Sequence, residues 1–298
     1  MHDSLKLLWG TIVLRPYVFA FLAAYIVAGW RHIGLKRTLA YIPVGYALAW
    51  ASEFSSIHCG FPYGDYFYIQ STAGRELWVF GVPFMDSLSY VFLSYCSYSL
   101  AAFLMTPVAL RSGNLIALET SQIRRSWQTL VLGAFLFVLL DIVIDPVALL
   151  GDQWFLGKIY GYHHEGFYFG IPMSNFGGWL FVGAVLVASL QALDAVPSLD
   201  SKVRLPVNGS SWLRLLGPVL YCSVLVFNIS VTFYIGQMLL GLVDLLLFAV
   251  LLVPMVFFTI YKNSTVSNEA VYNYLSQHSS MSGKPVSITL DPPKIDFR

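Results

Sequence analysis

The chain has 298 residues, of which 57% are hydrophobic and only 11% are charged. A soluble globular domain carries roughly 25% charged residues, so this composition excludes an ordinary soluble protein. The net charge of +1 gives no reason to expect a nucleic-acid partner. The cysteines Cys59, Cys96 and Cys222 are scattered, without the paired spacing of a metal site or a disulfide framework.

The apolar residues come in runs close to the ~20 residues with which a helix crosses a bilayer. Runs such as 131–140 and 245–258 lack the alternation of barrel strands and therefore indicate helices. The predicted fold is an all-α, polytopic membrane bundle of about seven transmembrane helices. In chain order the predicted spans are 11–30, 38–58, 79–106, 127–150, 171–193, 212–232 and 234–260. The third is long enough to tilt, or to begin with a short turn that does not cross the membrane.

The basic residues predict the orientation of the bundle, because cytoplasmic segments carry an excess of Lys and Arg. When the spans are threaded alternately, one side of the membrane receives only Lys6, Arg15, Arg75 and Lys158. The other side receives the remaining 13 of the 17 basic residues, which are Arg31, Lys36, Arg37, Arg111, Arg124, Arg125, Lys202, Arg204, Arg214, Lys262, Lys284, Lys294 and Arg298. We therefore expect the N-terminus outside and the C-terminus in the cytoplasm.

The chain divides into a transmembrane helical domain, residues 1–262, and a polar tail, residues 263–298. The tail is rich in Ser, Asn, Pro and charge, so we expect it to be flexible and cytoplasmic. Two loops on the other side, 59–78 and 151–170, are crowded with aromatic residues and glycines. Because tyrosine suits a membrane interface, we expect these loops to fold over the outer mouth of the bundle.

Two segments of the bundle, 38–106 and 127–193, have the pattern of a weak parallel repeat. Each contains a helix with a late acidic residue, an aromatic loop, and a Gly-aliphatic-Pro sequence that opens the returning helix. A polar side chain follows that glycine by five positions in both segments. The corresponding pairs are Glu53 with Asp141 and Asp86 with Asn175.

Several polar residues lie within apolar spans or at their edges, and alternate threading brings all of them toward the outer face. Burial of a carboxylate in lipid is costly, so such residues usually face a bundle interior and mark a site. The alternative for the set is ordinary hydrogen bonding between helices. Glu53 could instead be a solvated carboxylate at the membrane interface, and Asp86 could stabilise the dipole of its helix. The set comprises Glu53, Asp86, Asp141, Asp145, Asn175, Asn228, Gln237 and Asp244.

Asp141 and Asp145 are four residues apart and share one face of a helix. Two carboxylates so close in a low dielectric cannot both ionise cheaply, so one is expected to hold a proton beside its conjugate base. This arrangement favours acid–base catalysis; a hydrogen-bonding pair that holds the bundle together is the alternative. His163 and His164 match no metal-ligand spacing, so we predict no metal site. A proton-donor role for His164 stays open.

Three blocks of this sequence resemble one known family. They are the segment from Glu53 to Tyr68 around Gly-Phe-Pro-Tyr-Gly-Asp-Tyr-Phe-Tyr, the Gly81-Val82-Pro83 sequence, and the segment from Asp141 through Asp145-Pro146 and Tyr168–Pro172 to Asn175-Phe-Gly-Gly-Trp179. Together they are similar to membrane carotenoid biosynthesis proteins of the CruF type, which include the γ-carotene and bisanhydrobacterioruberin hydratases. One departure is Tyr90, because the stretch after Pro83 is expected to be more apolar and to end in Trp.

The resemblance implies a carotenoid 1,2-hydratase that adds water to the terminal isopropylidene double bond of an acyclic end, without a cofactor. The expected partners are membrane lipid and a hydrophobic polyene in a bacterial or archaeal cell membrane; association with other carotenoid enzymes stays open. On chemical grounds Asp141, Asp145 and Glu53 are the catalytic candidates. The candidates for substrate binding are Tyr63, Tyr66, Asp86, His164, Tyr168, Asn175 and Trp179. A non-catalytic carotenoid- or lipid-binding protein and a proton-coupled transporter are the alternatives.

Overall fold

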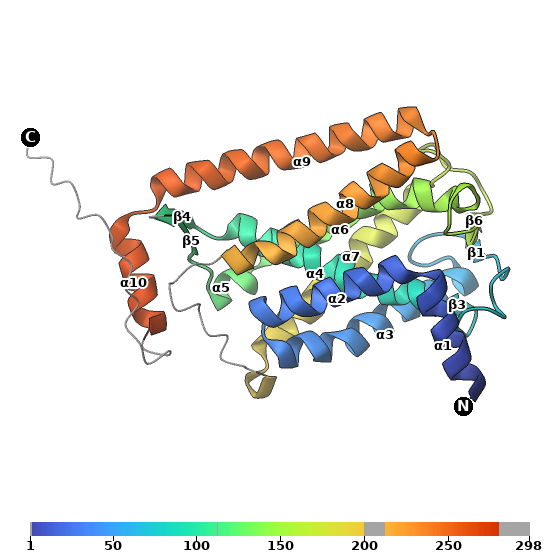
Figure 1. Cartoon of the computed structure of the whole chain (residues 1–298), viewed down its shortest axis with the longest axis horizontal. Helices are drawn as coiled ribbons and strands as arrows, with labels where there is room; N and C mark the ends of the chain where they lie inside the picture. The colour runs from blue at the N-terminus through green and yellow to red at the C-terminus, as the bar shows by residue number, and fades with distance from the viewer. Residues whose placement is uncertain (1, 112, 200–211, 280–298) are drawn as a thin grey trace, which may run out of the picture.

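A computed structural model of the chain describes residues 2–111, 113–199 and 212–279, and these are mostly helical. The helices are α1 His2–Leu14, α2 Pro16–His32, α3 Leu35–Cys59, α4 Phe84–Met105, α5 Ser121–Arg124, α6 Trp127–Leu149, α7 Met173–Ala195, α8 Leu216–Tyr234, α9 Met238–Thr265 and α10 Asn268–Ser279. Short 3-10 turns are η1 Gly151–Gln153, η2 Pro197–Leu199 and η3 Trp212–Leu215. The strands are β1 Tyr66–Tyr68, β2 Trp78–Val79, β3 Val82–Pro83, β4 Val108–Arg111, β5 Asn114–Ala117 and β6 Tyr160–Tyr162. The long helices lie side by side along the longest axis of the molecule (Figure 1).

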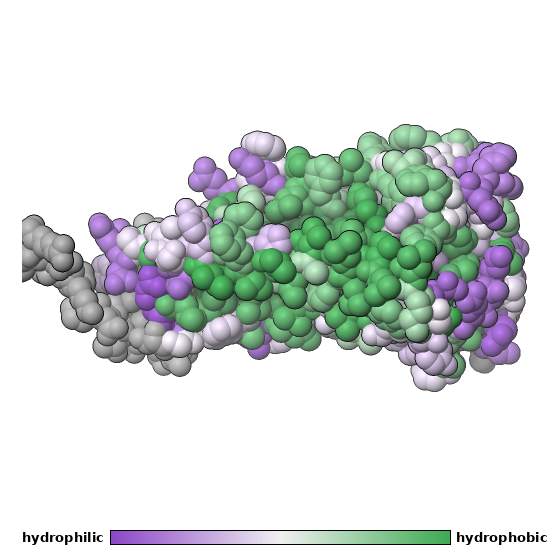
Figure 2. Space-filling model, turned by 90° about the horizontal axis from the view of Figure 1, so that it is seen from above, coloured by the Kyte–Doolittle hydropathy of each residue, from purple (hydrophilic) through white to green (hydrophobic). Residues whose placement is uncertain are grey.

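Five helices in the described residues are long and apolar enough to cross a membrane. They are α4, α6, α7, α9 and the continuous run of η3 and α8. Figure 2 shows the matching surface: a broad hydrophobic band covers the middle of the molecule, and hydrophilic residues gather toward its two ends. Helix α9 contributes the exposed side chains Leu242, Leu246, Val250, Val253 and Phe257. The fold is therefore a helical bundle built to lie in a membrane.

The structure differs from the first predicted span, 11–30. Helix α1 ends at Leu14 and α2 begins at Pro16, and the two helices meet at an angle of 89°. Proline disfavours helical backbone at the residue before it, so the break falls at Arg15, whose backbone is not helical. A single straight helix over 11–30 was a wrong prediction.

The third predicted span, 79–106, also begins too early. Strands β2 and β3 pair as a tight hairpin around Phe80 and Gly81, which have φ angles of +50° and +85°. Such left-handed backbone cannot belong to an α-helix, so α4 starts only at Phe84, after the N-cap Pro83. The other predicted spans agree with the observed helices to within a few residues, including α3, which continues through Pro43.

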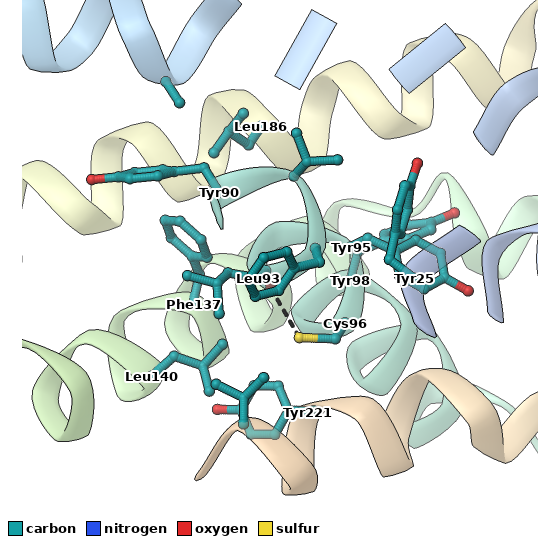
Figure 3. Packing of buried hydrophobic residues seen from close by; sticks show 14 of the residues in the cluster. Tyr25, Tyr90, Leu93, Tyr95, Cys96, Tyr98, Phe137, Leu140, Leu186 and Tyr221 are labelled. Carbon is teal, nitrogen blue, oxygen red and sulfur yellow. Dashed lines mark hydrogen bonds between the residues drawn. The ribbon is translucent and has the colours of Figure 1, made fainter. Parts of the chain in front are cut away.

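Helix α4 lies at the centre of the bundle, packed against α2, α3, α6, α7 and α8. Nearly all of its faces are buried, which is typical of a helix enclosed by others. Figure 3 shows Leu93 and Tyr98 of α4 near Phe137 of α6 and Tyr221 of α8. Serine hydroxyls within α4 bond to the carbonyl oxygens of the preceding turn, so their burial leaves them satisfied.

The end of the bundle opposite β1 and β6 is held by buried ion pairs. Asp194, at the end of α7, accepts hydrogen bonds or ion pairs from Arg37, Arg124 and Arg125. Burial alone would raise the pKa of Glu119. The nearby His32 and Arg214 have a larger opposite effect and hold the pKa of that carboxyl below its usual range. These contacts join α2, α3, α5 and α7 at one level.

The first part of the predicted flexible tail, 263–298, is helical in the structure. Helix α9 continues to Thr265, and α10 packs Val271 and Tyr274 against the β4–β5 hairpin. Burial of apolar side chains favours an ordered helix here. Residues 280–298 lie outside the described part of the chain.

Arg15 forms a buried, bidentate ion pair at the bend between α1 and α2. Its Nε and Nη2 atoms lie 3.0 and 2.9 Å from the carboxylate oxygens of Glu76, and its Nη1 donates to the carbonyl oxygen of Leu156. Both charged side chains are at most 2% exposed. Removal of one partner from a buried pair typically destabilises a protein by about 3–5 kcal/mol, because the other charge stays buried and unpaired.

We therefore expect Arg15→Ala to lower the melting temperature of the detergent-solubilised protein clearly. Arg75→Ala is the matched control, because Arg75 is exposed on the same loop as Glu76. Equal melting temperatures for the two variants would show that the Arg15–Glu76 pair does not hold this end of the bundle.

Candidate functional site

A chamber of about 130 Å³ lies inside the bundle, and its lining includes residues of β1 and β6. Figure 1 shows these two strands at one end of the bundle. Side chains from α2, α3, α4, α6, α7 and α8, and from the two aromatic loops, form its wall. Three carboxyl groups line it, those of Glu53, Asp86 and Asp145, while most of the remaining wall is aromatic or aliphatic. A few polar groups in an apolar wall are the usual composition of a small-molecule pocket.

The two aromatic loops meet over the chamber as an antiparallel pair, β1 with β6. In this register Tyr66 is opposite Tyr162, and Tyr68 is opposite Tyr160. Residues two apart on a strand point to the same face. All four tyrosines therefore line the chamber, whereas Phe67 between them is exposed on the other face.

Asp145, on α6, accepts three hydrogen bonds. The Tyr160 hydroxyl lies 2.6 Å from Oδ1, and Oδ2 accepts from the Tyr162 hydroxyl at 2.7 Å and from Asn175 Nδ2 at 3.0 Å. Burial and the nearby Asp145 carboxylate raise the pKa of Tyr160 and of Tyr162 above the ordinary value of a tyrosine. The two phenols therefore stay protonated and act as donors. Three donors, with no partner cation among the residues that the structure describes, suit a negatively charged carboxylate.

Asp141 lies one turn away from Asp145 and is fully buried. Its Oδ2 accepts from Nδ2 of Asn175 at 2.9 Å, so this one amide bridges both aspartates. The other oxygen, Oδ1, has no hydrogen-bond partner among the described residues, and Asp141 does not line the chamber. Asn175 does line the chamber, so its amide links Asp141 to the chamber wall.

The opposite wall of the chamber carries Glu53 of α3 and Asp86 of α4. Glu53 Oε2 accepts from the Ser87 hydroxyl at 2.6 Å, and Asp86 Oδ2 accepts from the Tyr68 hydroxyl at 2.6 Å. Asp86 interacts electrostatically with both Glu53 and Asp145, so it is close enough to influence the carboxyl groups of both walls. Among the described residues that line the chamber, none is Lys or Arg.

An aromatic group closes the chamber toward the middle of the bundle. Tyr90 and Trp179 stack with ring centroids 4.8 Å apart, and Phe137 and Tyr63 contact the same indole at 4.6 and 6.2 Å. Gly178 allows this approach, because a Cβ there would lie 2.7 Å from the carbonyl oxygen of Pro62. The wall therefore presents electron-rich ring faces beside the carboxyl groups.

The two segments expected to form a repeat have matching turns. Phe80 and Gly81 have φ angles of +50° and +85°, and Phe169 and Gly170 have +47° and +89°. In both segments a proline N-cap follows and the returning helix begins. Tyr90 and Trp179, each nine residues after its glycine, are the two rings that stack on each other.

Most of the candidate residues come together at the chamber. Those that line it are Glu53, Tyr63, Tyr66, Asp86, Asp145, Asn175, Trp179 and Asn228. Two candidates, Tyr168 and His164, do not line it. The ring of Tyr168 packs on Phe169 at the turn before α7, and His164 is exposed. Gln237 contacts Gln153, and Asp244 pairs with Thr232 at the turn between α8 and α9.

The sequence interpretation missed the tyrosines that bond to the aspartates, Tyr68, Tyr160 and Tyr162. The Tyr-Gly-Tyr spacing was available as a signal, because it places two phenols on one face of a strand. Tyr90 was visible only as a departure from the family pattern, although it lies one helical turn after Asp86. In the described part of the chain, no group of three or more His, Cys, Asp or Glu side chains could hold a metal ion.

Comparison with known protein families finds a match. A family described as carotenoid biosynthesis protein matches residues 8–252, which include every residue of the chamber. Comparisons with curated proteins and with solved structures found no match. The family resemblance predicted from the three sequence blocks is confirmed.

Proposed function

The chain belongs to the carotenoid biosynthesis protein family, and from this premise we propose that it is a hydratase. It adds water to the terminal isopropylidene double bond of an acyclic carotenoid end and yields a tertiary alcohol. The observation that carries this proposal is a small chamber with carboxyl groups on two opposing walls and aromatic rings between them. An alkene needs both a proton donor and a base for the incoming water, and opposing walls can supply the two.

In the proposed reaction Glu53 donates and Asp145 accepts a proton. The O–H bond of Glu53 breaks as its proton forms a C–H bond with the olefinic CH carbon, and a tertiary cation remains next to it. A water oxygen bonds to the cation while Asp145 takes the water proton. Asp86, which interacts with both carboxyl groups, relays that proton back to Glu53. Asp141 positions Asn175 and through it Asp145.

Electrostatics favours the presence of at least one protonated carboxyl group. Two unit charges 4 Å apart repel by about 4 kcal/mol at an effective dielectric of 20. Asp145 accepts three hydrogen bonds of 3.0 Å or less, whereas Glu53 accepts one such bond, from the Ser87 hydroxyl at 2.6 Å, with the Tyr68 and Tyr90 hydroxyls as further neighbours. We therefore assign the proton to Glu53 and the negative charge to Asp145 in the resting enzyme.

The ring of Trp179 stabilises the tertiary cation by cation–π attraction, which contributes roughly 2 kcal/mol at a desolvated site. We expect Trp179→Leu to lower turnover by about tenfold or more, since 1.4 kcal/mol equals one factor of ten. Trp179→Phe keeps a ring face and is expected to retain most of the activity. Equal losses in the two variants would indicate a packing role and not a role in cation stabilisation.

We place seven helices across the membrane: α2, α3, α4, α6, α7, α8 and α9. The basic residues then put the chamber and the β1–β6 pair toward the outside of a bacterial or archaeal cell membrane. Helix α1 bends away by 89° and would lie along the interface on that side. In this arrangement water reaches the chamber from the outer mouth, while the polyene approaches from lipid.

The test is expression of the chain in a bacterium that accumulates lycopene or γ-carotene. We expect a more polar carotenoid whose mass exceeds that of the parent pigment by one water. Unchanged pigment that co-purifies with the protein would support a non-catalytic carotenoid-binding protein instead. Proton-coupled uptake by reconstituted vesicles, with unchanged pigment, would support a transporter.

A further inference from the structure

An apolar groove of about 610 Å³ runs between α8 and α9 on the side of the bundle. Its walls combine one residue of α4 with residues of α8, α9 and the turn before α8. The lining residues are Phe103, Leu215, Pro218, Val219, Cys222, Ser223, Val226, Phe227, Met255, Val256, Thr259 and Ile260. None of these carries a charge, so the groove suits a hydrocarbon ligand.

Helix α9 is tied to the bundle at both ends of this groove. Near one end, Lys262 Nζ donates to the carbonyl oxygens of Leu104 and Thr106 at the end of α4. Near the other end, the Thr232 hydroxyl lies 3.4 Å from Asp244. The groove between these attachments is therefore framed by fixed contacts on both sides.

One side chain, Phe227, lines both the groove and the catalytic chamber. On the chamber side its ring stacks on Tyr17 at 5.4 Å and contacts Phe21 edge-on at 5.7 Å. Phe227 is half-buried. The two cavities therefore adjoin at this ring.

The size of the chamber requires such a second space for any long substrate. An apolar cavity of roughly 150 Å³ accepts a molecule such as benzene, and the chamber measures about 130 Å³. It can therefore hold the end group of a carotenoid but not the chain behind it. From Pro218 to Phe227 the groove follows α8 for roughly 14 Å at 1.5 Å per residue.

We propose that the α8–α9 groove binds the polyene chain of the substrate while its end group occupies the chamber, with Phe227 as the gate between them. The inference rests on the proposed function for the identity of the ligand. The groove adjoins the chamber at Phe227, which favours the substrate chain over a lipid acyl chain as its occupant. Occupation by lipid alone is the competing outcome.

The native Cys222 allows a binding test that does not depend on catalysis. Cys222 is half-buried in the groove, Cys96 is fully buried, and the exposed Cys59 can be removed as Cys59→Ser. In phosphatidylcholine nanodiscs, the full chain is treated with a membrane-permeant maleimide, with and without lycopene. At a polyene concentration roughly ten times its Kd, we expect labelling of Cys222 to slow about tenfold. An unchanged labelling rate would overturn the proposal and leave the groove to lipid.

A second test fills the groove by substitution. Ser223→Trp places an indole in it, and Ser230→Trp is the matched control two helical turns away, outside the groove. Both serines are exposed and bond to the carbonyl oxygen of the preceding turn. We expect Ser223→Trp to lower lycopene turnover by about tenfold while a short isoprenoid with the same terminal group reacts as before. Equal effects of both variants, or equal losses on both substrates, would contradict the proposal.

The two tests separate this inference from the proposed reaction. Protection of Cys222 without any hydration product would keep the groove as a polyene site and reject the hydratase. Hydration without protection of Cys222, and without an effect of Ser223→Trp, would keep the hydratase and reject the groove.

Discussion

Asp145→Asn is expected to abolish hydration, with turnover lowered by roughly 100- to 10,000-fold, the usual contribution of general acid–base catalysis. The amide has nearly the same shape, and its carbonyl oxygen still accepts from Tyr160 or Tyr162, but it cannot take a proton from water. Turnover of lycopene by purified protein in nanodiscs measures the effect. The melting temperature of the variant shows that the fold is retained.

Asp152→Asn is the control for this substitution, because Asp152 is an exposed carboxylate at the same end of the bundle. We expect it to keep the turnover of the unmodified protein. Full activity in Asp145→Asn would remove the base from the proposed reaction. It would leave the three hydrogen bonds to Asp145 with a structural role only.

Glu53→Gln is expected to have the second largest effect, a loss of roughly 100-fold or more in turnover. The glutamine side chain can still accept from Ser87, but it cannot deliver a proton strong enough to attack an alkene. The assay is again turnover of lycopene, with the melting temperature as a check of folding.

Glu165→Gln serves as the control for Glu53→Gln, since Glu165 is exposed on the second aromatic loop. The variant Asp141→Asn tests the competing assignment of the donor, in which the proton comes from the other aspartate of α6. Normal turnover in Glu53→Gln, together with a large loss in Asp141→Asn, would transfer the donor role to Asp141.

Part of the site was predictable because a polar side chain in an apolar membrane helix is costly and usually marks a site. Asp145, Glu53 and Asn175 stood out on this ground, and helical periodicity placed Asp141 and Asp145 on one face. The same periodicity does not say which of two neighbouring carboxyl groups reaches a cavity. Asp145 lines the chamber and Asp141 does not, and Asp141 is linked to the chamber wall only through Asn175 of another helix.

The aromatic loops were harder to predict, because their order comes from contacts far apart in the sequence. β1 pairs with β6 across more than ninety positions, and only this pairing turns Tyr68 and Tyr162 toward the aspartates. Tyr168 and His164 belong to the same kind of loop, yet no local rule gave the direction of their side chains. The hairpin at Phe80 was not predicted for a related reason, since one of its two left-handed residues, Phe80, is not a glycine.

The helices themselves follow from local physics more closely. The lengths of the apolar runs were enough to predict the bounds of α6 and α7 to within a few residues. The break at Arg15 follows from Pro16, whereas the ion pair of Arg15 with Glu76 joins this bend to a distant loop and had no local signal.

The central claim is that this chain adds water to a carotenoid end, and the origin of the product oxygen tests it most directly. Purified full-length protein in nanodiscs is incubated with lycopene in water enriched in ¹⁸O, and the pigment is analysed by mass spectrometry. We expect a tertiary alcohol that carries one ¹⁸O atom from water and forms without added reductant or oxidant. Unchanged lycopene, or a hydroxylated product with unlabelled oxygen, would contradict the account.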